Sequence, residues 1–123
     1  MYDSNTGFFL PDGSSLSPDA AYVTAEQMRG VTKEDRKHFL RLTPAFVIEL
    51  LSTSDSSSQS RKKMESWIAN GCQLGWLIDP YDRSVWIYEP GRAARIERAD
   101  KVMGSGPVEG LVLDLPPVWS AYE

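Results

Sequence analysis

A short apolar run interrupted by one acid, residues 46–51 (FVIELL), most constrains how this chain can fold. Such a run shortly after a proline, here Pro44, is typical of a strand buried on both faces of a sheet. Because side chains alternate along a strand, Glu49 shares a face with Val47 and Leu51, and Phe46, Ile48 and Leu50 form the other face. Neither face therefore has the polar pattern of a solvent-exposed surface. An ionised carboxylate there is costly unless it meets a cation, a metal ion or several donors. The function of this chain therefore depends on which group pairs with the Glu49 carboxylate.

A helix is predicted directly after this strand. Its signals are four candidate N-caps, a body over residues 63–69 and the stop signal Asn70-Gly71; the candidate caps are Ser54, Asp55, Ser56 and Ser57. At 100° per residue, Lys63 lies about 40° from the inward-facing Trp67 around the helix, whereas Lys62 lies about 140° from it. Lys63 is therefore expected at the margin of the buried side and Lys62 in solvent. Glu49 and Lys63 form a candidate catalytic pair.

Length and composition favour one globular domain over residues 1–123, since the chain is 41% hydrophobic and short. Its single cysteine, Cys72, excludes an internal disulfide, and neither a charged, apolar leader nor a long apolar run is present. We therefore expect a cytoplasmic protein. The net charge of −4 is not typical of a nucleic-acid coat protein. Basic residues gather in segments 29–41 and 92–101, where solvated faces and local DNA contacts are both open interpretations.

Further strands and one further helix are predicted from turn residues and periodicity. The strands are expected at residues 7–10, 20–23, 74–79, 84–88, 95–98 and 111–115, and the helix at 33–41, capped by Thr32. Asp79 and Asp82 would shape the turn between two of these strands. Asp19 follows a proline at the entrance of strand 20–23, where a turn or cap role competes with a role in a site.

Two acids at strand ends and a lysine facing the same space suit metal-assisted hydrolysis of a phosphodiester. Asp19 and Glu49 can hold a divalent cation through hard oxygen ligands, and Lys63 can orient or deprotonate water and stabilise charge. His38 is the only histidine and lies in a polar segment, so no Ser/His/Asp set competes. The sequence also has no Gly-rich phosphate loop and no zinc-spaced cluster of Cys and His.

Six short stretches together resemble a known family. They are TGFFLPDG (6–13), SPDA (17–20), FVIEL (46–50), STSD (52–55), KM (63–64) and GWLIDP (75–80). The combination looks like the Uma family, bacterial endonucleases of the PD-(D/E)xK restriction-endonuclease-like superfamily, over about residues 6–91. The resemblance implies an α/β fold, with a mixed sheet flanked by helices, and a nuclease that acts on DNA with Mg²⁺ or Mn²⁺.

Carried over residue by residue, the resemblance assigns roles to four residues. Asp19 and Glu49 would be metal ligands together with the backbone carbonyl of Leu50, and Asp19, Glu49 and Lys63 would be catalytic. Many relatives in the superfamily keep their lysine two residues after the second acid. That position is Leu51 here, and the Uma pattern moves the lysine to Lys63. The helix geometry and the resemblance therefore select the same lysine.

The sequence departs from the family pattern in two ways. Members usually open with a longer N-terminal segment, so this chain looks truncated, with a restriction-endonuclease-like core that lacks its N-terminal layer. The usual Pro-Asp before the Glu strand is Pro44-Ala45 here. A missing layer would leave apolar surface on one face of the sheet, and we expect a homodimer or larger homo-oligomer to cover it.

Three functions remain open from the sequence. The first is a metal-dependent DNA endonuclease, and the second is a degenerate, non-catalytic module of the same fold that binds DNA or a protein. The third is a structural dimer in which Glu49 and Lys63 form a buried ion pair. A melting temperature that rises with Mg²⁺ or Mn²⁺, and a Glu49→Gln variant that loses this rise, would favour the first. A large loss of stability without metal dependence would favour the third.

Overall fold

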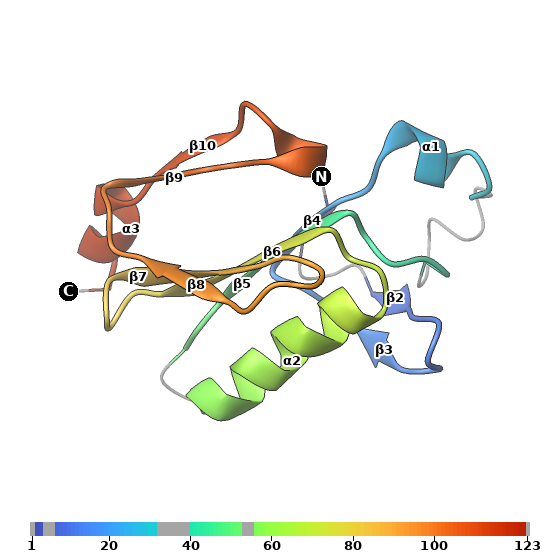
Figure 1. The fold of residues 1–123 in the computed structure, drawn as a ribbon, viewed down its shortest axis with the longest axis horizontal. Coiled ribbons are helices and arrows are strands. Elements are labelled where there is room, and N and C mark those ends of the chain that lie inside the picture. Colours follow the sequence, from blue (N-terminus) through green and yellow to red (C-terminus); the bar gives the residue numbers. More distant parts are fainter. Residues whose placement is uncertain (1, 4–6, 32–39, 53–55, 123) are drawn as a thin grey trace.

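A six-stranded sheet organises the chain in the computed structural model, which describes residues 2–3, 7–31, 40–52 and 56–122 (Figure 1). The strand order is β1-β4-β5-β6-β7-β8. These strands are β1 (Tyr2–Asp3), β4 (Ala20–Tyr22), β5 (Phe46–Leu50), β6 (Leu74–Asp79), β7 (Ser84–Tyr88) and β8 (Arg95–Glu97). β5 and β6 are parallel and the other neighbours are antiparallel, so the sheet is mixed, as predicted.

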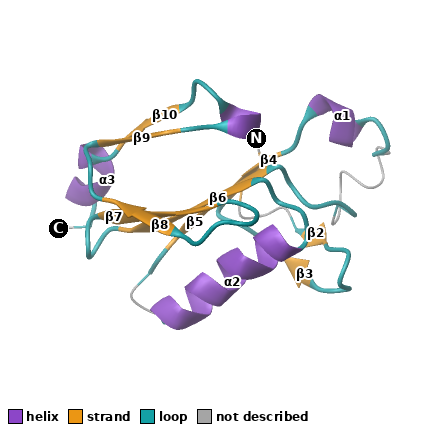
Figure 2. Ribbon diagram, viewed as in Figure 1, coloured by secondary structure: helices purple, strands orange, loops and turns teal. Residues whose placement is uncertain are grey.

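One longer helix, three short ones and two small hairpins flank this sheet in the described residues (Figure 2). The helices are α1 (Ala25–Met28), α2 (Ser57–Ala69), the 3₁₀ helix η2 (Gly106–Val108) and α3 (Pro116–Ser120). The hairpins pair β2 (Phe8–Phe9) with β3 (Ser15–Leu16), and β9 (Lys101–Met103) with β10 (Val112–Asp114). Within the described residues, no helix is both long and apolar enough to cross a membrane.

β5 separates two hydrophobic cores, so its first half is buried on both faces, as predicted, while Ile48 and Leu50 are only partly buried. Val47 and Leu51 belong to the core beneath the sheet, on the side of α2; other members are Phe8, Met64, Trp67 and Leu77. Phe46 belongs to the opposite core, with Leu74, Trp76, Val85 and Ile87. Phe46 and Val47 are both fully buried. A polar side chain on β5 therefore lies between packed layers rather than at an open sheet surface.

The face opposite α2 is covered by segment 101–120, which contains β9, β10 and α3 (Figure 1). Val102, Leu115 and Trp119 of this segment pack in the core with Phe46, Trp76 and Val85. The prediction that one sheet face stays bare is therefore wrong over this area, because another part of the same chain supplies the covering layer. Over β4 and β5 the side chains of Tyr22, Ile48 and Leu50 are only half-buried.

Capping and turn residues in the sequence correctly predicted where several helices and strands begin or end. α2 begins after Ser56, whose hydroxyl accepts a hydrogen bond from the Gln59 backbone N–H at 3.1 Å, and it ends at Asn70, as predicted. Asp79 shapes the turn after β6 by accepting hydrogen bonds from two backbone N–H groups, those of Tyr81 and Asp82. The elements β1, β3, β9, α1, η2 and α3 were not predicted. Several predictions lie outside the described residues: most of the helix at 33–41 with its cap Thr32, His38, and the candidate caps Ser54 and Asp55.

Candidate functional site

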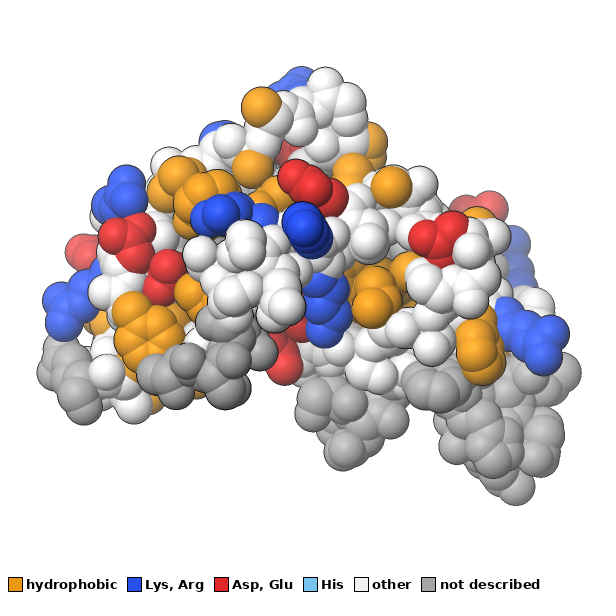
Figure 3. Space-filling model, turned by 90° about the horizontal axis from the view of Figure 1, so that it is seen from below, with side chains coloured by type: hydrophobic (Ala, Val, Ile, Leu, Met, Phe, Trp, Pro, Cys, Tyr) orange, Lys and Arg blue, Asp and Glu red, His pale blue; other side chains and the backbone are white. Residues whose placement is uncertain are grey.

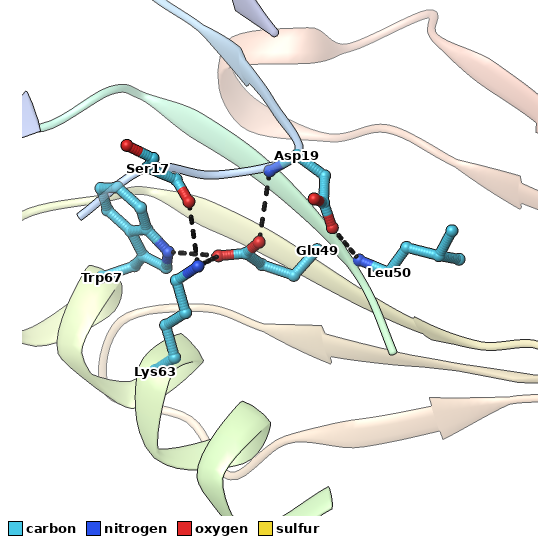
Figure 4. Close-up of polar contacts among 6 residues, drawn as sticks. All are labelled: Ser17, Asp19, Glu49, Leu50, Lys63 and Trp67. Carbon is cyan, nitrogen blue, oxygen red and sulfur yellow. Dashed lines mark hydrogen bonds and ion pairs between the residues drawn. The ribbon is translucent and has the colours of Figure 1, made fainter. Parts of the chain in front are cut away.

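The pairing of β4 with β5 brings the two predicted acids together. Ala20 lies opposite Ile48 in this antiparallel pair, so Asp19, one residue before β4, comes beside Glu49. The Asp19 backbone N–H donates to Glu49 Oε1 at 3.2 Å. In return, the Leu50 backbone N–H donates to Asp19 Oδ2 at 2.6 Å (Figure 4). Each acid is thus held by a backbone N–H group from the segment that carries the other acid.

Lys63 reaches the same carboxylate from α2. Its Nζ lies 2.9 Å from Glu49 Oε2 and donates to the backbone carbonyl of Ser17 at 2.9 Å (Figure 4). The Lys63 side chain is 34% exposed, at the edge of the buried side of the helix, whereas Lys62 is exposed. The predicted orientations of the two lysines are therefore confirmed.

Trp67, one helical turn after Lys63, also binds Glu49. Its indole Nε1–H donates to Glu49 Oε2 at 3.0 Å, and the Trp67 side chain is fully buried. Glu49 is only 6% exposed. The carboxylate thus receives three donors, one from each of Lys63, Trp67 and Asp19, and these offset the cost of removing its charge from water.

Burial dominates the electrostatics of Glu49. It raises the pKa of this carboxyl above the ordinary value of 4.5, and the negative charge of Asp19 adds to the rise. The hydrogen bond and charge of Lys63, followed by the hydrogen bond of Trp67, act in the opposite direction. A buried acid with a raised pKa and a specific charge partner, placed at a cleft, is typical of a functional site.

The acids and the lysine line one polar cleft of about 370 Å³. Its lining residues are Asp19, Glu49, Leu50, Ser52, Gln59, Ser60 and Lys63. A water molecule occupies about 30 Å³ in the liquid, so this space suffices for a phosphate group together with several waters. Three separate parts of the chain form the cleft: the entrance of β4, the end of β5 and the first half of α2.

The donor chemistry of this cleft fits a hard divalent cation. Asp19 and Glu49 supply carboxylate oxygens, and Mg²⁺ is typically bound by one or two carboxylates while it keeps several waters. Among the described residues, no group of three or more His, Cys, Asp or Glu side chains is arranged to hold a metal ion, so the two carboxylates would need further oxygen ligands from the backbone or from water. Leu50 lines the cleft and its N–H binds Asp19, while the role of its carbonyl as a ligand remains a prediction.

Sequence reasoning missed two groups that contact the lysine and the acid. The indole of Trp67 was expected only as a core group, although its position four residues after Lys63 places both side chains on one side of α2. The carbonyl of Ser17, which binds Lys63, carries no sequence signal, because any residue type supplies a backbone carbonyl.

Charges outside the cleft are mixed rather than uniformly basic. Seen from below, blue and red side chains lie interspersed over the described part of the surface (Figure 3). In segment 92–101, Arg95 pairs with Glu89, and Arg98 pairs with Asp82 at 2.8 Å. These pairs support the interpretation of that segment as a solvated, charge-balanced face.

Comparisons with known proteins connect this site to a family. A family model named Uma2 and described as a putative restriction endonuclease matches residues 1–116. The crystal structure of a putative nuclease belonging to DUF820 from Anabaena variabilis superimposes with a TM-score of 0.76 at 22% sequence identity. The match covers 97% of this chain and 66% of that protein, so the chain spans just under two thirds of its length. The two chains share their fold. No curated protein matches the chain.

Proposed function

Because the chain belongs to the Uma2 family of putative restriction endonucleases, we propose that it is a metal-dependent endonuclease that hydrolyses phosphodiester bonds in DNA. The observation that carries this proposal is the meeting of Asp19, Glu49 and Lys63 in one polar cleft. The two carboxylates suit a divalent cation. That cation and the adjacent Lys63 ammonium together suit the negative charge that develops on a phosphoryl group during hydrolysis.

The proposed cofactor is Mg²⁺ or Mn²⁺, held by the carboxylates of Asp19 and Glu49 and by the backbone carbonyl of Leu50. Such an ion, when bound, neutralises charge on the phosphoryl oxygens and makes water a stronger nucleophile. Two of these residues already constrain one another, because the Leu50 N–H fixes one oxygen of Asp19. Preorganised ligands of this kind spare the protein a rearrangement when the ion binds.

Lys63 is proposed to act on the phosphoryl group and on the attacking water. As the ion-pair partner of Glu49, its ammonium brings a positive charge and N–H donors to the wall of the cleft. It can stabilise developing negative charge and orient or deprotonate the attacking water. Gln59 and Ser60 lie within one turn of Lys63 on α2 and line the same cleft, where they can donate hydrogen bonds to phosphate oxygens.

The ion pair between Glu49 and Lys63 also supports a second candidate, a non-catalytic protein in which this pair is purely structural. Melting temperatures with and without metal separate the two. In the nuclease, Mg²⁺ or Mn²⁺ at about 100 times its Kd should stabilise the fold by about 2.7 kcal/mol, because the ion binds the folded state alone. Glu49→Gln and Asp19→Asn should each abolish this gain. If neither Mg²⁺ nor Mn²⁺ changes the melting temperature of the wild-type chain, the nuclease proposal is refuted.

The proposal includes a single cytoplasmic domain over residues 1–123 that forms a homodimer or larger homo-oligomer. The half-buried apolar side chains of Tyr22, Ile48 and Leu50 support association through the β4–β5 part of the sheet. Light scattering of the full chain tests this. A monomer that persists at high concentration would refute the oligomer and leave the proposed chemistry standing.

A further inference from the structure

One oxygen of Glu49 receives two donors from a single helix. Lys63 Nζ and Trp67 Nε1 lie 2.9 and 3.0 Å from Glu49 Oε2, and these two residues are four apart on α2 (Figure 4). The other oxygen, Oε1, accepts the Asp19 N–H instead. The two oxygens therefore have distinct surroundings, with Oε2 on the side of the helix and Oε1 on the side of the second acid.

The two helix donors differ in rigidity. Lys63 has a long, flexible side chain that is one third exposed, so water competes for its ammonium. The Trp67 indole is fully buried and packs edge-on against the Phe8 ring, with ring centroids 6.1 Å apart and an interplanar angle of 80°. A planar group fixed in this way cannot follow the carboxylate if it turns. Of the two donors, Trp67 is therefore the one that can define where Oε2 sits.

We infer that Trp67 is a positioning residue for Glu49: its indole N–H fixes Oε2 and so leaves Oε1 directed at Asp19 for the metal ion. This inference rests on the proposed function. It extends that function by assigning a metal-orienting role to a residue that packing alone would explain. Trp67 does not touch the ion or the substrate, and it acts through the carboxylate that it holds.

The chain offers a matched control in Trp76. This side chain is also almost fully buried, at 1% exposed, but it lies in the opposite core and packs edge-on against Phe46. Its Nε1 has no hydrogen-bond partner among the described residues. Trp67→Phe and Trp76→Phe therefore remove the same atoms from two buried sites, and only the first removes a donor from Glu49.

The test is Mn²⁺ binding to the metal-stripped full chain, followed by electron paramagnetic resonance of the free ion. Removing a group that orients a metal ligand typically weakens binding by about 10- to 100-fold, and we expect this loss in Trp67→Phe. Trp76→Phe should keep the wild-type affinity to within about twofold, because it leaves the ligands and their donors in place. Equal affinities in the two variants, or equal losses, would overturn the role of Trp67. A wild-type chain that binds no Mn²⁺ would instead refute the proposed function itself.

A second measurement needs only the folded wild-type chain, and so remains decisive if Trp67→Phe fails to fold. The indole N–H resonances of a ¹⁵N-labelled sample are followed as Mg²⁺ is added, with that of Trp76 assigned from Trp76→Phe and that of Trp67 from its contacts with the Phe8 ring. The Trp67 signal should move as Mg²⁺ saturates, because the oxygen that it binds belongs to a metal ligand, while the Trp76 signal stays in place. A Trp67 signal that does not respond to bound Mg²⁺ would overturn the inference.

Discussion

Replacing Lys63 by alanine removes an ammonium 2.9 Å from Glu49 Oε2 and, with it, the hydrogen bond to the Ser17 carbonyl. Hydrogen bonds to charged groups contribute about 1.5–3 kcal/mol net, whereas fully exposed ion pairs contribute about 0–1 kcal/mol. This pair lies between the two cases, because Glu49 is buried and Lys63 is one third exposed. We therefore expect Lys63→Ala to lose about 1–2 kcal/mol at neutral pH without metal, which lowers the melting temperature by several degrees.

The loss should depend on pH. Burial raises the pKa of Glu49 above 4.5, so the folded protein holds this proton more tightly than the unfolded chain does. Ionising Glu49 therefore costs stability as the pH rises through the raised pKa. Lys63 is the main influence that limits this cost, so removing Lys63 raises the pKa of Glu49 further. The difference in stability between wild type and Lys63→Ala should be small below the raised pKa of wild-type Glu49 and complete only above the still higher pKa of Glu49 in the variant.

Urea unfolding in chelator at acid and at mildly alkaline pH measures this difference, and a double-mutant cycle with Glu49→Gln isolates the pair. The coupling energy should be about 1–2 kcal/mol at the higher pH and should vanish at the lower one. Lys62→Ala is the matched control, since an exposed lysine of the same helix should change stability by less than about 0.5 kcal/mol. A coupling energy that is equal at both pH values, or absent at both, would refute the electrostatic argument.

Three further predictions concern the lysines, the packing of β6 and the cysteine. In a form that cleaves DNA, Lys63→Ala should slow cleavage by a factor of about 10² to 10⁴. Lys62→Ala should alter only the salt-sensitive affinity for DNA. Equal losses of the cleavage rate in the two variants would show that the catalytic lysine is wrongly assigned. In Gly75→Ala the new Cβ would lie 2.6 Å from Met64 Cε, the far end of a flexible side chain that can shift, so chemical denaturation should show a loss of only about 1 kcal/mol. The same substitution should cost less in a Met64→Val background, and an equal cost there would contradict the contact. Burial raises the pKa of the Cys72 thiol to about 12. A disulfide reagent at mildly alkaline pH should therefore label this thiol only after unfolding. Rapid labelling of the native chain would contradict the burial of Cys72.

Local patterns were sufficient to predict the half of the site that β5 and α2 supply. The alternation around Glu49 fixed its face, and the spacing of Lys63 from Trp67 fixed the direction of the lysine. Both inferences depend on residues less than twenty positions apart in the sequence. The structure confirms them because strand and helix geometry leave little freedom over such distances.

The covering layer over the second sheet face could not be predicted in the same way. The two prolines after the strand predicted at 111–115 suit the end of a strand, but Pro116 begins α3, because proline suits the first turn of a helix equally well. β9 has three residues and pairs with β10 beyond an intervening loop, so it shows too few alternations for a pattern. The burial of Trp119 against the sheet is a long-range contact without a local signal.

Asp19 shows most clearly where sequence reasoning needs a long-range fact. Its place after a proline suits a turn residue as well as a metal ligand, and the resemblance, not the pattern, selected the second role. What makes it a neighbour of Glu49 is the register of β4 against β5, with Ala20 opposite Ile48. A slip of one residue would turn β4 over and move the Asp19 carboxylate away from the cleft. The two bonds that link Asp19 to Glu49 and Leu50 oppose this slip, so the side chains proposed to bind the metal also help to fix the strand pairing that brings them together.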